Sequence, residues 1–290
     1  LLPVIQTQAR IVFDLCVTRD GLGALVTPRD GVVRRVTLRG ARVEPLRVPS
    51  ARYAFESSHG EIVTATDGGT ISFCDPTTSG VVGRVVLEGS DATQLVASEG
   101  GAFAVTWFKG NQLAMIDVGE RRLGASWTTD RQIKNACVSR QGYVGVAMDD
   151  GSVCVFDGQG KPAGTRLGAG AKVTTMTFSQ DGSVMGVADE SGQTRVWDWR
   201  TGVVAARVVG SGKGVMTLAF LDGGRRLAGG GDDQLVHVWS LPSGEELLTF
   251  AGHRMHVARV CATPDGQTLV SIDGTGELRL GNETFPLRAG

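Results

Sequence analysis

Several features that define other classes of protein are missing from this sequence of 290 residues. No apolar run reaches the roughly 18 residues that a membrane-spanning helix needs, and residues 1–10 are too polar and too short for a secretory signal. The formal net charge is only −1, so no overall field recruits nucleic acid or an anionic membrane. The first residue is not Met, as expected of a processed chain or a piece of a longer one. We therefore expect a protein without membrane insertion.

Cysteine motifs are missing as well. The five cysteines form no C-x-x-C pair, which argues against both a disulfide framework and a zinc site. Three of them, Cys16, Cys137 and Cys261, each lie five residues before a turn glycine, in a slot that is apolar or small elsewhere in the chain. We interpret them as core residues, because a free thiol packs like a small hydrophobe. Free thiols also favour a reducing compartment, so an intracellular, cytoplasmic protein is expected.

Aromatic residues make up only 6% of the chain, whereas glycine is abundant, with 42 residues. Glycine reaches positive φ without a Cβ clash, so this composition favours short strands joined by tight turns. Two series of markers recur every 38 to 42 residues along the whole sequence. The first is a turn glycine, at Gly21, Gly60, Gly101, Gly142, Gly182, Gly224 and Gly266. The second follows it by 15 or 16 residues, at Thr37, Asp75, Asp117, Asp157, Asp198, Ser240 and Asn282.

Each repeat contains four segments of strand length. In the fifth repeat, an apolar run at 173–178 precedes the turn glycine and a second run at 183–188 follows it. A third run at 193–198 ends at the marker, and a fourth follows at 203–209. Four strands in about forty residues are typical of a propeller blade. The sequence therefore predicts an all-β fold, a seven-bladed β-propeller of four-stranded antiparallel blades, in one domain over residues 1–290.

The ends of the chain predict how the ring closes. After Asn282 only eight residues remain, too few for both a loop and a fourth strand. Leu1-Leu2 lies about as far before Gly21 as the Leu247-Leu248 pair of the sixth outer strand lies before Gly266. We therefore expect residues 1–8 to supply the outer strand of the last blade.

Short signatures within the repeats carry a family resemblance. Trp197 and Asp198 end the fifth repeat, Trp239-Ser240 keeps half of that pair, and Gly252-His253 precedes the seventh repeat. The chain thereby resembles the WD-repeat family of β-propellers, which is named after the Trp-Asp pair. The resemblance implies a structural role for Trp197 and Asp198.

The same resemblance implies a structural role for one histidine. In WD-repeat proteins the His of the Gly-His pair joins a Ser or Thr, a turn Asp and the Trp in a buried hydrogen-bonded tetrad. Here His253 would meet Ser271 and Asp273, while the place of the Trp is taken by Gly281. The tetrad is therefore expected to be incomplete.

Catalytic and metal motifs are not supported by the spacing. His253, Ser271 and Asp273 have the composition of a catalytic triad, but the resemblance accounts for them as structure. The four histidines lack ligand spacing, and the Asp149-Asp150 and Asp232-Asp233 pairs fall in expected turns. The sequence from Gly210 to Gly214 lacks the Walker spacing. We expect no enzyme, no cofactor, no metal and no small-molecule substrate.

Surface recognition remains as the predicted function. On a propeller, the loops that lead into each inner strand and the turns between the two middle strands gather on one face. Residue types that often dominate binding energy recur there, and we predict a protein or peptide partner in a multi-subunit assembly. The predicted partner-binding residues are Arg52, Tyr53, Trp107, Phe108, Lys109, Trp127, Arg131, Lys172, Lys213, Arg254, Met255 and His256. Trp107 and Phe108 replace Ala65 and Thr66 of the preceding blade, and packing of Trp107 in the core is the alternative interpretation.

A basic cluster supports a second hypothesis. Seven arginines lie between Arg29 and Arg52, against only Asp30 and Glu44. Besides Arg52 they are Arg29, Arg34, Arg35, Arg39, Arg42 and Arg47. Such a cluster is either a solvated surface or a dock for an acidic partner. The first hypothesis is a non-catalytic interaction scaffold, and the alternative is a ribonucleoprotein subunit whose arginine cluster contacts phosphate.

Overall fold

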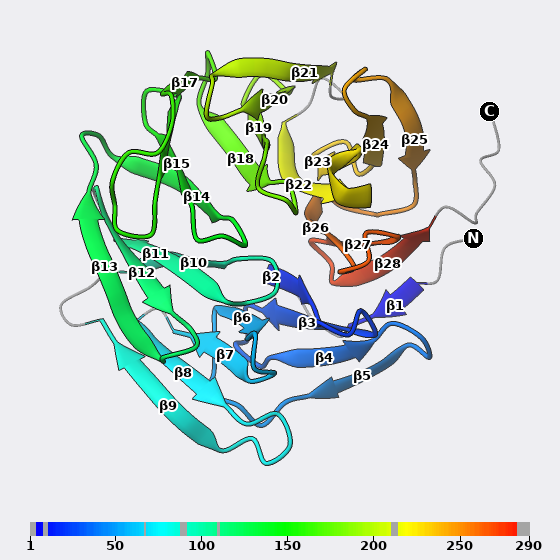
Figure 1. The fold of residues 1–290 in the computed structure, drawn as a ribbon. Helices are drawn as coiled ribbons and strands as arrows, with labels where there is room; N and C mark the ends of the chain where they lie inside the picture. The colour runs from blue at the N-terminus through cyan, green and yellow to red at the C-terminus, as the bar shows by residue number, and fades with distance from the viewer. Residues whose placement is uncertain are drawn as a thin grey trace.

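The fold consists of seven four-stranded antiparallel sheets arranged around a central axis (Figure 1). A computed structural model describes residues 4–7, 11–66, 68–87, 92–108, 111–209 and 214–282. In each sheet the first strand lies next to the axis, and the inner strands β2, β6, β10, β14, β18, β22 and β26 contact one another in a closed ring. The predicted seven-bladed β-propeller is confirmed.

The first four blades are continuous in sequence, each running from the inner to the outer strand. Blade 1 contains β2 (Val12–Val17), β3 (Gly23–Pro28), β4 (Arg34–Thr37) and β5 (Arg42–Pro45). Blade 2 contains β6 (Tyr53–Glu56), β7 (Ile62–Ala65), β8 (Thr70–Cys74) and β9 (Val81–Val86). Blade 3 contains β10 (Ala92–Ala97), β11 (Phe103–Phe108), β12 (Gln112–Asp117) and β13 (Arg122–Thr128). Blade 4 contains β14 (Ile133–Val138), β15 (Val144–Met148), β16 (Ser152–Phe156) and β17 (Leu167–Gly168).

The last three blades follow the same order, except that the seventh combines both ends of the chain. Blade 5 contains β18 (Val173–Phe178), β19 (Met185–Asp189), β20 (Gln193–Asp198) and β21 (Val203–Val209). Blade 6 contains β22 (Val215–Leu221), β23 (Arg226–Gly231), β24 (Val236–Ser240) and β25 (Glu246–Phe250), with a 3-10 turn at Asp222–Gly224. Blade 7 contains β26 (Val257–Ala262), β27 (Thr268–Asp273), β28 (Glu277–Asn282) and β1 (Val4–Gln6).

The N-terminal strand closes the ring as predicted. β1 pairs antiparallel with β28, with Ile5 opposite Leu278, and the Ile5 side chain is only 2% exposed. Residues 1–3 and 8 of the predicted closing segment lie outside the described residues. The described part of the chain offers no helix with the length and apolarity to cross a membrane.

The turn glycines mark the inner hairpins because their backbone requires positive φ. Gly182 has φ +68°, a conformation that costs a side-chain-bearing residue energy. Beside it, Ser179 Oγ accepts the Val184 N–H at 3.1 Å and donates to Asp181 Oδ1 at 2.6 Å. Thr18 with Asp20 and Thr263 with Asp265 repeat this arrangement, which explains why the glycine spacing identifies the blades.

The hydrophobic core is divided among the gaps between neighbouring blades. In the gap between blades 3 and 4, Trp107 and Leu113 of blade 3 pack with Ile133 and Val146 of blade 4. Facing sheets bury one another's apolar side chains, so the ring as a whole supplies what a single sheet lacks.

One side of the ring, here called the loop face, carries the loops into the inner strands and the turns between the middle strands. Backbone hydrogen bonds tie the two kinds of segment together within a blade. Asp149 N–H donates to Gln132 O at 3.0 Å in blade 4, and Glu190 N–H donates to Lys172 O at 2.9 Å in blade 5. Each inner strand therefore begins at the loop face, where its first residues surround the axis.

Candidate binding site at the channel mouth

Seven polar residues line the inner strands close to the loop face. Each lies seven residues before the turn glycine of its repeat. Six of them are the third residue of their strand, and Tyr53 is the first residue of β6. We call this set the polar ring: Asp14, Tyr53, Gln94, Asn135, Thr175, Thr217 and Arg259. The same spacing that identifies the blades could have found the ring, but only Tyr53 was among the sequence-predicted residues.

A backbone irregularity shapes the mouth of the channel. In β2, β10, β14, β18, β22 and β26 the register shifts immediately before the ring residue, because one extra residue bulges out of the pairing. Two of these bulge residues, Lys134 and Met216, are exposed. Bulges redirect side chains and are common next to functional sites.

Members of the polar ring reach across to the next blade. Arg259 Nε of blade 7 lies 3.4 Å from Asp14 Oδ1 of blade 1. Asn135 Nδ2 donates to Thr174 O at 3.0 Å, and Thr217 Oγ1 accepts the Val260 N–H at 3.0 Å. These contacts hold the ring in one arrangement, so a ligand would meet a preorganised surface.

Two arginines and an aspartate lie together at the mouth. Arg259 pairs with Asp14, and both Arg259 and Arg52 act electrostatically on the nearby Tyr53 phenol. Burial raises the pKa of Asp14 above its ordinary value, although the Arg259 guanidinium opposes the shift. The Arg52 guanidinium lies 4.9 Å from the centroid of the Phe13 ring and 5.9 Å from that of Tyr53, and burial raises the pKa of the Tyr53 phenol. The mouth therefore has a charge that complements an acidic group.

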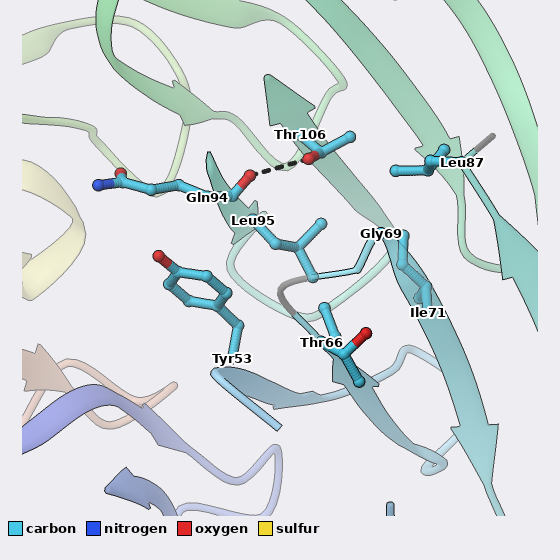
Figure 2. Close-up of a pocket in the computed structure, with 9 residues that line it drawn as sticks. Tyr53, Thr66, Gly69, Ile71, Leu87, Gln94, Leu95 and Thr106 are labelled. Carbon is cyan, nitrogen blue, oxygen red and sulfur yellow. Dashed lines mark hydrogen bonds between the residues drawn. The ribbon is translucent and has the colours of Figure 1, made fainter. Parts of the chain in front are cut away.

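An open pocket adjoins the mouth between blades 2 and 3 (Figure 2). The space within its outline is about 240 Å³, which includes open solvent, so the hollow itself is shallow. Its walls are Tyr53, Ala65, Thr66, Gly69, Ile71, Leu87, Gln94, Leu95 and Thr106. Figure 2 shows the Tyr53 phenol and the Gln94 side chain extending to one side, away from Ile71 and Leu87. Thr106 Oγ1 donates to Gln94 O at 2.9 Å, so this hydroxyl group is satisfied within the wall.

Blades 2 and 3 differ in the residue that pairs with the ring residue. Ala65 ends β7 opposite the ring residue Tyr53, and Trp107 of β11 lies opposite the ring residue Gln94. Ala65 belongs to the core between blades 2 and 3, whereas Trp107 belongs to the core between blades 3 and 4. Blades 4 and 5 have alanine at this position, Ala147 and Ala188, so Trp107 is the exception among these four blades.

The structure separates the predicted partner-binding residues into different environments. Arg52 and Tyr53 lie together at the channel mouth. Trp107 is only 3% exposed, so its prediction as a contact residue is wrong and the alternative, core packing, is correct. Phe108 is half-buried against the core between blades 2 and 3.

The remaining predicted contacts are divided between the outer rim and the loop face. Trp127 is half-buried in the outer strand β13, with its ring centroid 6.0 Å from that of Phe156. Arg131 and Lys172 are on the loop face, with Arg131 Nε 2.9 Å from Asp150 Oδ2 and Lys172 Nζ 3.8 Å from Glu190 Oε1. Arg254, Met255 and His256 form the loop before β26, where the Arg254 side chain is 80% exposed. Lys109 and Lys213 lie outside the described residues.

The basic cluster does not form one surface. Its members are distributed along blade 1, in the order Arg29 in the β3–β4 turn, Arg34 and Arg35 in β4, Arg39 before β5, Arg42 in β5 and Arg47 after it. Arg34 Nη2 lies 2.7 Å from Asp30 Oδ2 near the loop face. Arg39 lies at the opposite face, near Asp265 of blade 7. The hydrogen bond from Thr263 is the main effect that lowers the pKa of Asp265, and the Arg39 charge contributes least. Antiparallel strands thus separate arginines that are close in sequence.

The predicted structural histidine meets both of its expected partners. His253 Nε2 lies 2.8 Å from Ser271 Oγ, and its Nδ1 lies 3.4 Å from Asp273 Oδ2. The His253 side chain is 2% exposed and burial lowers its pKa, so it is neutral near pH 7. Asp273 Oδ1 accepts the N–H groups of Thr275 and Glu277 at 2.9 and 3.1 Å, which fixes the turn before β28.

A further acidic residue joins this histidine. Ligand-type atoms of His253, Asp273 and Glu277 lie within 4.8 Å of one another, a group that sequence spacing did not reveal. The Arg279 guanidinium donates to Glu277 Oε1, with Nε at 2.7 Å, and so already supplies positive charge there. The group is therefore explained as a buried ion-pair network of blade 7 rather than as a metal centre.

The two residues of the Trp-Asp pair have separate positions. Trp197 is partly buried against the core between blades 4 and 5, where the fully buried Trp199 donates from Nε1 to Gly182 O at 2.9 Å. Asp198 ends β20, and its Oδ1 accepts the Arg200 and Thr201 N–H groups at 3.0 and 3.2 Å. The hydrogen bond from the Thr201 backbone is the largest of the effects that lower the pKa of Asp198.

The fold and the channel mouth define a seven-bladed β-propeller with a preorganised ring of polar residues at the loop face. Comparison with known families places two of its segments in a recognised repeat, since residues 160–198 and 204–240 match the family model described as "WD domain, G-beta repeat". These matches show WD repeats in blades 4 to 6 of the seven-bladed propeller.

Individual relatives match only parts of the chain. Periodic tryptophan protein 2 of Arabidopsis thaliana is 34% identical over 108 residues, 36% of this chain and 12% of that protein. WD repeat-containing protein 1 of Bos taurus is 26% identical over 219 residues, 73% of this chain and 36% of that protein. Transcription initiation factor TFIID subunit 5 of Caenorhabditis elegans is 39% identical over 54 residues, 19% of this chain and 8% of that protein. The chain thus spans well under half the length of these relatives.

Proposed function

We propose that this protein is a non-catalytic interaction scaffold that binds a protein or peptide partner at the channel mouth on its loop face. The observation that carries the proposal is the coincidence of three features at one place. These are the polar ring, the excess of cations around Asp14, and the open pocket beside Tyr53. Preformed concave surfaces with a few fixed polar groups are the usual geometry of binding sites.

The named relatives support a role within an assembly. One is named as a subunit of transcription initiation factor TFIID, and others are named only for their repeats. Because fold alone does not determine function, the proposal rests on the geometry of the mouth and takes only this general support from the relatives.

The triad-like residues do not favour an enzyme. A nucleophilic Ser needs access to substrate, but His253 and Ser271 are both buried, with exposed fractions of 7% and 6%. The division of the basic cluster between the two ends of blade 1 also weakens the alternative of a single phosphate-binding surface.

Two matched double variants test the proposal. Lys134→Glu with Met216→Ser removes one exposed cation and one exposed apolar side chain from the channel mouth. Arg122→Glu with Leu123→Ser removes the same kinds of group from the exposed face of the outer strand β13. Surface substitutions of this kind change stability little, so both variants should stay folded.

The assay is affinity capture from native lysate by each purified variant, with and without nuclease. We expect the partners of the wild type to survive nuclease, to be lost with the mouth variant, and to be kept with the outer-strand variant. Partners that disappear on nuclease treatment would instead support the ribonucleoprotein hypothesis. Partners that are indifferent to the mouth variant would contradict binding at this site.

A further inference from the structure

We propose that a proton on the His237 side chain latches the outer strand of blade 6 to the turn between its two middle strands, and that the latch opens when this proton is lost. His237 is the second residue of β24, where it lies opposite Gly229 of β23 and Thr249 of β25. The latch belongs to one blade and goes beyond the proposed function, since it does not depend on binding at the channel mouth.

Each ring nitrogen of His237 faces a carboxyl group. Nδ1 lies 2.6 Å from Oε1 of Glu246, in β25, and Nε2 lies 2.8 Å from Oδ2 of Asp233, in the turn before β24. An ionised carboxylate only accepts hydrogen bonds, and a neutral imidazole has a single N–H group to donate. Both contacts can therefore exist together only when the ring carries two protons and a positive charge.

The additional proton lies on the imidazole rather than on a carboxyl group. Glu246 Oε1 also accepts the Thr249 hydroxyl proton, and this hydrogen bond, followed by the one from His237, holds the pKa of Glu246 below its ordinary value. Asp233 Oδ1 accepts the Leu235 N–H at 3.1 Å, as an ionised carboxylate does. Burial acts to lower the pKa of His237, but its hydrogen bonds to the two carboxylates outweigh burial and raise it overall.

The corresponding position takes a cation in other blades as well. It lies three residues before the second marker of each repeat, and it holds arginine in blades 1, 5 and 7 and an uncharged residue in blades 2, 3 and 4. In chain order these residues are Arg34, Ser72, Ala114, Cys154, Arg195 and Arg279. Arginine keeps its charge at any pH at which proteins are folded, whereas histidine loses its charge near neutral pH. Blade 6 therefore has a titratable form of this cation.

The cation makes the same kind of pair in blades 1 and 5. Arg34 Nη2 lies 2.7 Å from Asp30 Oδ2, and Arg195 Nη1 lies 3.1 Å from Asp189 Oδ2. Both acids lie, like Asp233, at the turn between the middle strands of their blade. Blade 6 adds a second acid, which lies in its outer strand, so the cation there joins the turn to that strand.

Loss of the proton should release Glu246 rather than Asp233. The Glu246 side chain is 45% exposed, so its carboxylate can turn into water at little cost. The Asp233 side chain is only 11% exposed, and it also fixes the turn through the Leu235 N–H. Neutral His237 should therefore keep its hydrogen on Nε2, and β25 should lose a contact that its backbone pairing does not replace.

The other neighbours of the ring carry no charge. The Trp239 ring stacks on it, with centroids 5.5 Å apart and an angle of 12° between the planes, an arrangement that favours the protonated ring. The buried side chains that blade 5 contributes to this gap are apolar, namely Ala188, Val196, Ala206 and Val208. Among the described residues, the titratable groups that face His237 are therefore Asp233 and Glu246.

NMR spectroscopy of the intact chain with isotopically labelled histidine tests the protonation. We expect both ring nitrogens of His237 to be protonated at about pH 6, a titration midpoint above 6.5, and loss of the proton from Nδ1 as the pH rises. Glu246→Ala should lower the midpoint, whereas Glu245→Ala, which removes the adjacent exposed acid, should leave it unchanged. His237→Gln identifies the signals of this ring among those of the four histidines.

Hydrogen exchange tests whether the proton holds β25. In the wild type, the protection of the β25 amides that pair with β24 should fall about threefold or more between about pH 6 and pH 9, after correction for intrinsic exchange rates. It should be low at both pH values in His237→Gln and should not depend on pH in His237→Arg, which introduces the residue of blades 1 and 5. The β21 amides of blade 5, where Arg195 keeps its charge, are the internal control.

Circular dichroism shows whether each variant is folded. If a His237 variant unfolds, Glu246→Ala, at an exposed site, decides the question, because it should give low β25 protection at both pH values. A His237 ring with one N–H group at about pH 6, or with a midpoint at or below 6.5, would overturn the inference.

A raised midpoint with β25 protection that is the same in the wild type and all variants would also overturn it, because the proton would then hold nothing in place. Neither result affects the proposed function, which is tested separately by the capture of partners with the mouth variant.

Discussion

Replacing Trp107 by alanine tests directly whether this residue stabilises the fold or contacts a partner. The indole is 3% exposed in the core between blades 3 and 4, where its neighbours include Leu113 and Ile133. Removing a buried Trp side chain costs about 3 to 5 kcal/mol, because the transfer energy is lost and a cavity remains. With an unfolding entropy of about 2.1 cal/mol/K per residue, the 290 residues correspond to about 0.6 kcal/mol/K. We therefore expect Tm to fall by about 5 to 8 °C.

Differential scanning calorimetry measures this change, and Trp127→Ala is the matched control. Trp127 is half-buried at the outer rim, so its removal should lower Tm by about half as much or less. A Trp107→Ala protein that melts within 1 °C of the wild type, but no longer binds its partners, would refute the assignment of Trp107 to the core.

Three further predictions concern the closure and the polar networks of the propeller. Deletion of residues 1–8 removes the buried Ile5 and exposes β28, so it should lower Tm by more than about 5 °C in a thermal melt. An unchanged Tm would contradict closure of the ring by β1. Burial lowers the pKa of His237, but its hydrogen bonds to Glu246 and Asp233 outweigh burial, so the pKa is raised overall. The protonated histidine therefore stabilises the fold fully below pH 6.5, and this stabilisation is lost as the pH rises through the pKa of the folded state. His237→Gln should therefore cost about 1 kcal/mol more at about pH 5.5 than at pH 9 in urea unfolding, and equal costs would contradict this sign. Ser271→Ala removes the partner 2.8 Å from His253 Nε2 and should cost about 1 to 3 kcal/mol by the same assay, whereas a neutral effect would show that this buried contact contributes nothing.

The fold could be predicted because each blade repeats the same backbone requirement. Every inner hairpin has a glycine such as Gly182, with φ +68°, and six of the seven have a hydroxyl residue such as Ser179 three residues earlier, so their spacing counts the blades. Short strands in a closed ring then leave few alternatives for the chain. Even the closure by β1 followed from counting residues, because a missing outer strand at one end must be supplied by the other.

The candidate site was harder to predict because it depends on which way a side chain faces. The sequence places both Trp107 and Tyr53 at the loop-face end of a strand. Only the packing of neighbouring sheets shows that the Trp107 indole is buried between two blades. Trp127 was expected in a loop, but β13 extends to Thr128 and places it at the outer rim. Arg34 and Arg39 are five residues apart, and the β4–β5 hairpin carries them toward opposite ends of the blade.

Comparison of equivalent positions among the blades offers a way to locate function within such a repetitive structure. Six inner strands shift register before their ring residue, but β6 begins at Tyr53 itself and has no such shift among its described pairs. Opposite the ring residue, Ala65 of blade 2 is matched by alanine in blades 4 and 5, so the departure at that position is Trp107 of blade 3. A position that serves only the scaffold should meet the same packing demands in every blade. Trp107 departs from the alanine of its neighbours and is 3% exposed in the core, so a departure of this kind has to be checked for burial before it is assigned to binding.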